Sequence, residues 1–482
     1  MTKKDLKITE HFKLNKTQAE VDFIDIYVSK DVPLFLDPWA IRQWSDDFSI
    51  SCHSVISSFF EQLLEYVIDW DESNALSILS WLREPSETHL WFSKWWISWS
   101  WIWKIKAIEI YKKLKDSDAV RTWFLNDLED TALMIEGIKE DNISDIVTNL
   151  LRYQLIKYTQ EQCDIYGIEM RDGTPTWYYW NETKWEWEAS RGRMLVIDWK
   201  KVILVPKLFV TKTLAINFSD YYNFEILEFE QALHLSAGSS LCKTLKAWRK
   251  SKPTKKDLKQ EHPKNKKEYV YKISKENPKL LDDFKKKRSD LYKVLSDESI
   301  DEDLDLRKII HDLILELKSI DPWKKDAYKY EHVVLGILQI IFYPELYKPT
   351  VQYKINGEQK IIDITYQNTA RNWFFFNLIQ SKIACKEIYF ECKNYKNDLK
   401  NPEVDQLNGR FNSRVSEIGF LVYRKIDNID DFNKRIDFFI NQWHFIIGLS
   451  DNDLITLLNH KLLWRAKEIN DFLEAKINRL IT

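Results

Sequence analysis

Residues 386–394 read KEIYFECKN, and this stretch decides how the C-terminal third of the chain folds. Its alternation of side chains predicts a β-strand, in which successive residues point to opposite faces of a sheet. Glu391 and Lys393 are two positions apart and therefore leave the same face, whereas Phe390 and Cys392 point to the other. A carboxylate and an ammonium group side by side on an apolar strand indicate a functional site.

The sequence on both sides of this strand predicts an α/β domain. The expected order from residue 327 is helix, strand, strand, helix, strand, helix, strand, over residues 327–342, 351–355, 358–367, 371–382, 386–394, 402–411 and 417–425. The first two strands form a hairpin, because Asn356-Gly357 is a favoured two-residue turn. Asp363 lies in the second strand of this hairpin, and we expect it to lie beside Glu391 and Lys393.

Two carboxylates and a lysine at one edge of a sheet suit the hydrolysis of phosphodiesters. Carboxylate oxygens are the ligands that Mg²⁺ prefers in proteins. The metal ion lowers the pKa of bound water and neutralises the charge that develops on the phosphate. A lysine beside the metal orients the attacking water and stabilises the transition state.

This combination of residues resembles the PD-(D/E)XK nuclease superfamily, whose restriction-endonuclease-like fold has an αβββαβ core. The resemblance covers residues 325–425 and implies that Asp363, Glu391 and Lys393 are catalytic. It also implies that Asp363 and Glu391 hold Mg²⁺, or Mn²⁺ in its place. The expected function is a cytoplasmic, metal-dependent DNA endonuclease, and bacterial nucleases of this fold often act in restriction or phage defence.

Two further residues match parts of the superfamily pattern, and two features depart from it. Gln406 lies on the helix after Glu-x-Lys, where some branches have Gln, and Glu331 lies on the first helix, in what we expect to be its first turn. Solvent exposure alone would also explain Gln406, and the helix dipole alone would explain Glu331. Ile362 stands where the family has Pro, and 27 residues separate Asp363 from the Glu-x-Lys motif because of an inserted helix.

Several alternatives stay open. The Glu-x-Lys spacing also occurs at residues 182–184, 316–318 and 474–476, and the motif at 391–393 could be a surface salt bridge on an edge strand. The domain could be a nucleic-acid-binding or sensor protein that does not cleave, or a nuclease acting on RNA or on repair structures. Cleavage of both DNA strands would favour a homodimer, because each site of this type cuts one strand.

The rest of the chain is expected to form two further regions. Residues 1–240 read as a larger mixed α/β region with a recognition or regulatory role, residues 241–320 as a basic, partly helical connector, and residues 321–482 as the nuclease-like domain. Lys and Arg number 18 against 7 Asp and Glu over residues 241–290, which fits either a solvated connector or a DNA-backbone contact. The segments VPLFLDPWAI (32–41) and LREPSETHL (82–90) resemble an uncharacterised bacterial family.

Composition restricts the class of protein. The formal net charge is only −3, so a nucleic-acid surface must come from local clustering of basic residues. No apolar run is long enough for a transmembrane helix, and the N-terminus has no apolar core of a signal peptide. The five cysteines form no CxxC pair, so we expect neither disulfides nor a structural zinc site.

The chain has 21 Trp but only 10 Gly, although about 7% of an average protein is Gly. Six Trp fall within residues 91–103, where neither a helical nor a strand pattern explains them. We hypothesise that many Trp positions are UGA codons that the source organism reads as Gly. Substitution by Gly would turn residues 91–103 into a loop before a helix, and Asp198-Trp199 into an Asp-Gly hairpin turn. Trp180 and Trp187, beside other aromatic residues, are candidates for genuine Trp.

Overall fold

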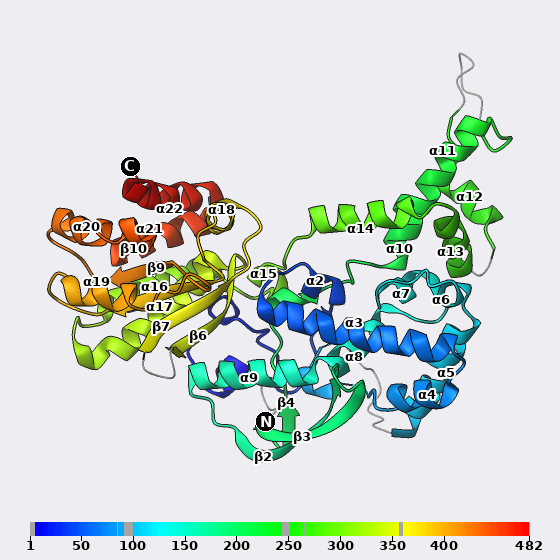
Figure 1. The fold of residues 1–482 in the computed structure, drawn as a ribbon, viewed down its shortest axis with the longest axis horizontal. Helices are drawn as coiled ribbons and strands as arrows, with labels where there is room; N and C mark the ends of the chain where they lie inside the picture. Colours follow the sequence, from blue (N-terminus) through cyan, green and yellow to red (C-terminus); the bar gives the residue numbers. More distant parts are fainter. Residues whose placement is uncertain are drawn as a thin grey trace. The chain divides into compact units, whose positions relative to one another are not determined.

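The computed structural model describes residues 5–83, 85–90, 100–242, 251–263, 266–355 and 360–481, with the backbone alone at 100–104, 355 and 481. The chain divides into two units (Figure 1). Unit 1 comprises Met1–Ser29, Gln160–Glu169 and Leu295–Thr482, and unit 2 comprises Lys30–Thr159 and Met170–Val294. The chain is therefore a mixed α/β protein, as expected from its sequence.

Unit 1 is built on a five-stranded mixed sheet with the order β10-β9-β8-β7-β6. Its strands are β6 (Leu346–Ile355), β7 (Lys360–Asn368), β8 (Glu387–Lys393), β9 (Ile418–Tyr423) and β10 (Phe445–Ser450). Its helices are α1 (Ile8–His11), α15 (Asp297–Ile300), α16 (Leu306–Ser319), α17 (Ala327–Phe342), α18 (Trp373–Gln380), α19 (Asn401–Asn408), α20 (Ile429–Asp437), α21 (Asp451–Leu462) and α22 (Ala466–Ile481).

The strands of unit 1 pair as an antiparallel meander that continues into parallel strands. β6 with β7 and β7 with β8 are antiparallel, whereas β8 with β9 and β9 with β10 are parallel. The order α17-β6-β7-α18-β8-α19-β9 is the one expected from the sequence. The expected turn at Asn356-Gly357 lies outside the described residues, and the last described pair of its hairpin is Ile355 with Lys360.

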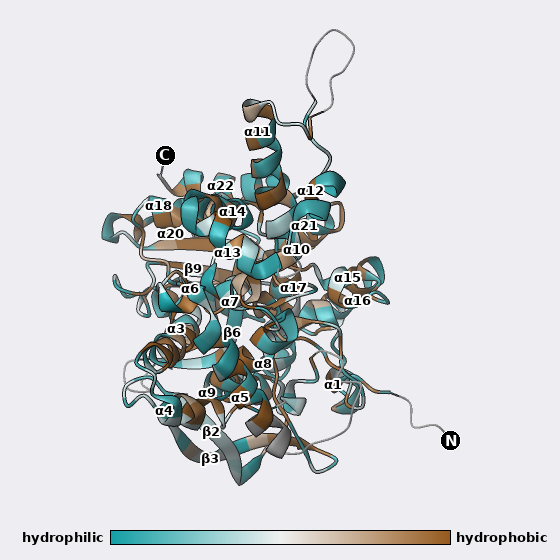
Figure 2. Cartoon of the chain, turned by 90° about the vertical axis from the view of Figure 1, so that its right-hand side faces the viewer, coloured by the Kyte–Doolittle hydropathy of each residue, from teal (hydrophilic) through white to brown (hydrophobic). Residues whose placement is uncertain are grey.

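The elements of unit 1 begin and end for local reasons. α17 ends at Phe342, before Tyr343 and Pro344, because the residue before a proline avoids the helical region. Pro402 lies in the first turn of α19, where a missing N–H costs nothing. Every residue of β9 is buried, and Figure 2 shows this strand as hydrophobic. Such a continuous apolar strand is typical of a parallel strand covered on both faces.

The first 29 residues belong to unit 1, which differs from the expected ranges 1–240, 241–320 and 321–482. The physical reason is a set of long-range contacts made by the N-terminal segment. The Asp22 carboxylate accepts hydrogen bonds from the Lys348 backbone amide (3.1 Å) and from the Gln339 side chain (3.3 Å). Lys7 also forms an ion pair with Asp301 (2.5 Å). Domain boundaries drawn as consecutive sequence ranges cannot take such long-range contacts into account.

Unit 2 contains most of the remaining helices, a two-stranded sheet β1-β5 and a three-stranded antiparallel sheet β2-β3-β4. Its strands are β1 (Phe35–Leu36), β2 (Arg171–Asn181), β3 (Glu186–Ile197), β4 (Lys200–Val202) and β5 (Val210–Thr211). Its helices include α2 (Pro38–Arg42), α3 (Asp47–Ile68), α4 (Glu72–Leu79), α5 (Ser100–Asp116), α6 (Asp118–Arg121), α7 (Asp130–Met134), α8 (Glu140–Leu150), α10 (Phe218–Asp220), α11 (Leu227–Ala237), α12 (Lys255–Glu261), α13 (Lys266–Glu276) and α14 (Lys279–Leu291), and α9 (Arg152–Tyr166) ends in unit 1.

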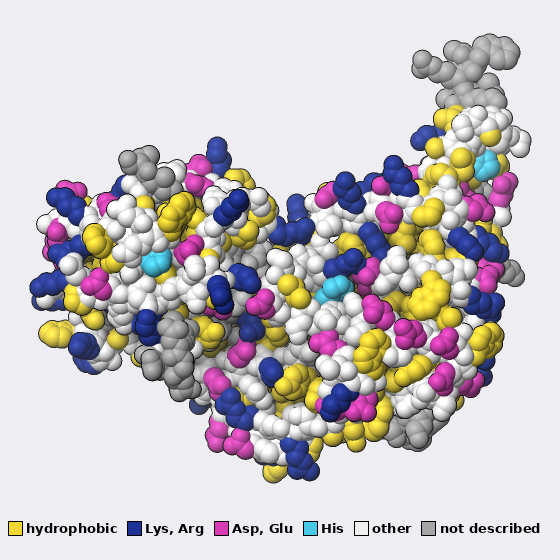
Figure 3. All heavy atoms as spheres, viewed as in Figure 1, with side chains coloured by type: hydrophobic (Ala, Val, Ile, Leu, Met, Phe, Trp, Pro, Cys, Tyr) yellow, Lys and Arg dark blue, Asp and Glu magenta, His cyan; other side chains and the backbone are white. Residues whose placement is uncertain are grey.

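The basic segment of unit 2 folds as α12, α13 and α14. Several of its cations form ion pairs with acidic residues of the same unit, namely Lys255 with Glu228, Lys285 with Asp127 and Asp130, Lys287 with Glu225, and Arg288 with Asp220. On the face seen in Figure 3, basic and acidic side chains are interspersed. Part of the positive charge of this segment is therefore neutralised within the unit.

Eight tryptophans adopt the left-handed backbone conformation that favours glycine. Among the described residues, fifteen non-glycine residues have positive φ, and eight of them are Trp70, Trp123, Trp177, Trp185, Trp199, Trp373, Trp443 and Trp464. All eight are exposed, with 37% to 83% of their surface accessible. Asp198 and Trp199 have φ of 46° and 67° and join β3 to β4, as an Asp-Gly hairpin turn requires. This pattern is what the recoding hypothesis predicts.

Other tryptophans behave as ordinary core residues. Trp180 is 2% exposed, its ring packs edge-on against Phe59, and its indole N–H donates to Ser58 Oγ (3.0 Å). The indole of Trp187 donates to the carbonyl of Ile78 (3.0 Å). These are the two positions that the sequence offered as candidates for genuine Trp. The stretch 91–99 lies outside the described residues, and α5 follows it as the expected helix.

Two general expectations agree with the structure. All five cysteines are free, and four of them are buried. Over the described ranges, no helix is both long and apolar enough to cross a membrane.

Candidate active site

Asp363 and Glu391 lie at the point where the pairing of β7 with β8 ends. The paired residues run from Gln367 with Glu387 to Ile364 with Phe390, and Asp363 and Glu391 each come one position later in this register. The Asp363 carboxylate accepts a hydrogen bond from the backbone N–H of Cys392 (2.8 Å). The Asp363 side chain thus binds an amide of β8 just beyond the last backbone pair. This hydrogen bond keeps the Asp363 and Glu391 carboxylates at the same end of the strand pair.

Lys393 contacts both Glu391 and Gln406. Its Nζ atom lies 2.6 Å from Oε1 of Glu391, which is two residues earlier on the same strand. The same Nζ donates to Oε1 of Gln406 on α19 (2.9 Å). Glu391 is 1% exposed and Lys393 7% exposed. The motif is therefore a buried ion pair, and the alternative of a surface salt bridge is wrong.

Arg410, two residues after the end of α19, is a site residue that the sequence did not single out. Its guanidinium forms an ion pair with Oε2 of Glu391, and the residue is 6% exposed. Both oxygens of Glu391 therefore face a cation, Lys393 on one side and Arg410 on the other. The signal was present in the spacing: Gln406 and Arg410 are four apart, a distance that brings side chains together at the end of a helix.

Glu331 approaches the site from α17 and is held by Gln352 of β6. The Gln352 amide donates to both carboxylate oxygens of Glu331, at 3.1 and 3.0 Å. Glu331 lies beyond the first turn of α17, which contains no acidic residue, so the expected first-turn position is wrong. Gln352 has φ of 52° and lies between Val351 and Tyr353, which pair with the two neighbours of Asp363. It too was missed by sequence reasoning.

Burial and neighbouring charges shift the ionisation of this cluster. Burial raises the pKa of Asp363, although the Cys392 amide, Lys393 and Arg410 partly offset the rise. Burial raises the pKa of Glu331 to about 7; the Gln352 hydrogen bonds oppose this shift, and the charge of Asp363 adds to it. The electrostatic influence of Asp363 on Glu331 indicates that the three carboxylates belong to one cluster.

The residues fit a divalent cation in their chemistry, but Glu391 is already engaged. Asp363 and Glu391 are hard oxygen ligands at the same register step, one position past the paired ends of β7 and β8, and Glu331 adds a third carboxylate nearby. Within the described ranges, no three His, Cys, Asp or Glu side chains already stand in an arrangement that could hold a metal ion. At the candidate site, Lys393 and Arg410 form ion pairs with the two Glu391 oxygens, so these oxygens do not face a shared metal position.

Three further Glu-x-Lys pairs, at residues 182–184, 316–318 and 474–476, do not form such a cluster. Residues 316–318 lie within α16 and residues 474–476 within α22, where a spacing of two places side chains on different sides of the helix. Residues 182–184 lie in the turn between β2 and β3, and Lys184 pairs with Glu188 instead. Of these four pairs, only Glu391 and Lys393 lie together within one strand, with the Asp363 carboxylate hydrogen-bonded to the amide of the residue between them, as expected.

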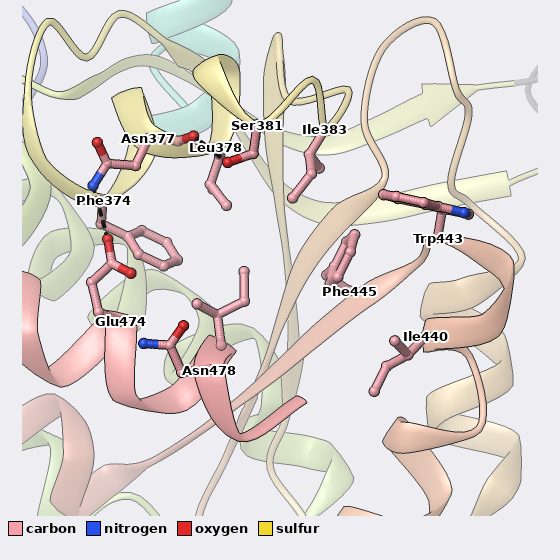
Figure 4. A pocket seen from close by; sticks show the side chains of 11 residues that line it. Phe374, Asn377, Leu378, Ser381, Ile383, Ile440, Trp443, Phe445, Glu474 and Asn478 are labelled. Atoms are coloured by element: carbon pink, nitrogen blue, oxygen red, sulfur yellow. Dashed lines mark hydrogen bonds between the residues drawn. The ribbon is translucent and has the colours of Figure 1, made fainter. Parts of the chain in front are cut away.

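A separate cavity in unit 1 of about 330 Å³ lies between α18, β10 and α22 (Figure 4). It contains none of the predicted site residues, and its walls are mostly apolar, with Phe374, Ile383 and Phe445 among them. Its polar side includes Glu474, which accepts a hydrogen bond from Asn377 (2.9 Å). Glu474 is the only charged residue in this lining, so we place the candidate site at Glu391 and not in this cavity.

Comparison with known proteins matches the N-terminal part of the chain to a family model. Residues 13–217 match the family model described as "Domain of unknown function (DUF8370)". No curated protein and no solved structure matches the chain. The family match covers less than half of the chain, and it ends before the candidate site begins at Glu331.

Proposed function

We propose that the C-terminal part of unit 1 is a metal-dependent nuclease of the PD-(D/E)XK type that hydrolyses phosphodiester bonds of DNA. The observation that carries this proposal is the placement of Asp363 and Glu391 one step past the paired ends of β7 and β8, with Lys393 Nζ 2.6 Å from Glu391. The surrounding elements follow the αβββαβ order apart from the inserted helix α18, which supports the same assignment.

Each residue has a distinct part in this proposal. Asp363 and Glu391 would hold Mg²⁺, or Mn²⁺, which supplies an acidified water and neutralises charge on the phosphate when bound. Lys393 is placed to orient that water and to stabilise the transition state as a cation. Gln406 accepts a hydrogen bond from Lys393 and thereby fixes the direction of its ammonium group. Such positioning is a major part of catalysis in phosphoryl chemistry.

Glu331 supplies a third carboxylate with different ionisation. Because burial and Asp363 raise its pKa to about 7, it is partly protonated at neutral pH. Glu331 can therefore accept a proton, or lose its proton and become a further metal ligand. Before either event it contributes less than a full negative charge to the site. Its two hydrogen bonds from Gln352 hold it in place for either role.

DNA is the proposed substrate because of the resemblance of the site residues to the superfamily, and a role in restriction or phage defence follows from the same resemblance. Two cuts, one on each strand, would require two such sites and therefore favour a homodimer. The remaining part of the chain, including the residues that match the family of unknown function, would then contribute recognition or regulation.

One observation favours a second function, a nucleic-acid-binding or sensor protein that does not cleave. The ion pair of Arg410 with Glu391 occupies an oxygen that a metal ligand needs. In a permanently closed site this cation would replace the metal ion.

Cleavage of supercoiled plasmid and of linear phage DNA, with Mg²⁺ or with EDTA, tests the proposal. We expect metal-dependent cleavage, and a loss of at least about 100-fold in Lys393→Met, since a positioned proton-transfer group contributes about 10²–10⁴. Lys396→Met, at an exposed position three residues later, is the matched control. Cleavage of RNA or branched DNA alone would show that the substrate is one of these and not duplex DNA. No cleavage of any substrate would favour the binding protein.

A further inference from the structure

Arg410 stands out in unit 1 because it is a buried cation placed against a carboxylate that the proposed function needs for a metal ion. The ion pair with Glu391 lies among residues that are almost fully buried, at 6% and 1% exposure. Burial lowers the pKa of Arg410, and the charge of Asp363 opposes this effect. The guanidinium therefore interacts electrostatically with Asp363 as well as with Glu391. Arg410 is therefore an internal counter-ion of the site.

The local charges are already balanced without a metal ion. Asp363 and Glu391 provide two negative charges, and Lys393 and Arg410 provide two positive charges. Adding a divalent cation to such a set brings like charges together at low dielectric, which is unfavourable. The cost falls if Arg410 leaves Glu391 and if a phosphate group enters with its own negative charge.

The position of Arg410 suits such a movement. It follows Gly409 in the turn after α19, outside the helix itself. Lys360, an exposed residue at the start of β7, donates to the Gly409 carbonyl, so a second cation lies beside this turn. Arg binds phosphate oxygens through two parallel N–H donors, and such charge-assisted pairs are stronger than neutral ones. A phosphate beside this turn would meet both Arg410 and Lys360.

We propose that Arg410 couples metal binding to nucleic-acid binding: it holds Glu391 in the free protein and releases it when its guanidinium transfers to a backbone phosphate. This inference rests on the proposed function and adds a regulation of the same site. The site would then bind a divalent cation weakly until a nucleic acid is present. Because coupling of two ligands is reciprocal, the metal ion would strengthen nucleic-acid binding by the same factor.

Mn²⁺ binding, measured by electron paramagnetic resonance of the free ion, tests this inference without any activity readout. The full chain is titrated alone and with a phosphorothioate DNA duplex that resists cleavage. In the wild type we expect DNA to raise Mn²⁺ affinity about tenfold or more. In Arg410→Gln, Mn²⁺ should bind at least about tenfold more tightly without DNA, and DNA should change the affinity less than about threefold. Arg414→Gln, an exposed arginine in the same loop, should behave as the wild type.

The outcomes separate the two proposals. If Arg410→Gln and the wild type bind Mn²⁺ equally, with the same response to DNA, Arg410 does not couple the two ligands, although the proposed function stands. If neither protein binds Mn²⁺ with or without DNA, or if Asp363→Asn leaves Mn²⁺ binding unchanged, the metal-dependent function is itself wrong. Arg410→Lys keeps the charge without the paired donors, and we expect it to retain weak Mn²⁺ binding in the absence of DNA.

Discussion

The Nζ atom of Lys393 lies 2.6 Å from Oε1 of Glu391, although the two residues are only two positions apart on one strand. Strand geometry makes this possible, since residues i and i+2 share a face. Burial gives the pair its significance, because two charges are seldom removed from water without partners or a function. Gln406 on one side and Arg410 on the other complete the surroundings of this pair.

Removal of the Glu391 charge should destabilise unit 1. In Glu391→Gln, Lys393 and Arg410 stay buried but lose their common counter-ion, so we expect a loss of about 3 kcal/mol in the free energy of unfolding. Urea denaturation followed by circular dichroism measures it. Asp405→Asn, an exposed position on the same helix as Gln406, should change the free energy by less than about 0.5 kcal/mol. Equal effects of the two substitutions would contradict the ion-pair network.

The stability of the protein should depend on the protonation of Glu331. Its pKa is raised from 4.5 to about 7 in the folded state, so the folded protein keeps this proton to a higher pH than the unfolded chain does. Stability from this group is full below pH 4.5 and is lost as pH rises toward 7. Glu331→Gln should remove this loss. The free energy of unfolding of the variant, relative to that of the wild type, should therefore increase by up to about 3 kcal/mol between pH 4.5 and 7.

Unfolding free energies measured at several pH values in EDTA test this dependence. The control is Glu468→Gln, at an exposed position of α22. A difference between Glu331→Gln and the wild type that stays constant from pH 4.5 to 7 would show that Glu331 does not titrate in this range.

The Trp residues with positive φ should be replaceable by Gly with a gain in stability. Trp199 is 83% exposed and has φ of 67°, where a side chain with a Cβ atom costs about 1 kcal/mol or more. We expect Trp199→Gly to raise the free energy of unfolding by about 1 kcal/mol, whereas Trp180→Gly, in the core, should lower it by at least about 3 kcal/mol. Thermal denaturation of both variants gives the comparison.

Peptide mass spectrometry of the protein isolated from its native host tests the recoding directly. Gly is expected at the eight exposed positions with positive φ, and Trp at residue 180. Detection of Trp at residue 199 in the native protein would falsify the recoding hypothesis at that position.

The buried charge cluster of unit 2 should depend on Lys285. Its Nζ atom lies 2.8 Å from Asp127 and 2.7 Å from Asp130, and Asp130 is fully buried. Lys285→Met would leave the buried Asp130 without its cation, whereas Asp127 keeps its ion pair with Arg42, and we expect a cost of about 3–5 kcal/mol. The exposed neighbour Lys286→Met is the matched control and should change stability by less than about 0.5 kcal/mol. Chemical denaturation of the two variants tests the difference.

Sequence periodicity alone was enough for the elements around the candidate site. The expected helix over residues 327–342 is α17, and the expected strand over residues 386–394 contains β8. Both patterns are long or regular enough to identify the element, since the helical and strand periods differ clearly. The apolar runs at residues 21–28 and 32–41 also have the composition of strands, yet within them only Phe35–Leu36 forms one. Short apolar runs do not distinguish a strand from other buried segments.

The sequence by itself determined that Glu391 and Lys393 share a face of one strand, because this relation depends only on local backbone geometry, and it led us to expect Asp363 beside them. Only the tertiary structure decided that Arg410 neutralises Glu391, that Gln352 holds Glu331, and that the first 29 residues belong with the C-terminal unit. Such contacts join positions far apart along the chain. They depend on how loops close and helices pack, which no local pattern encodes.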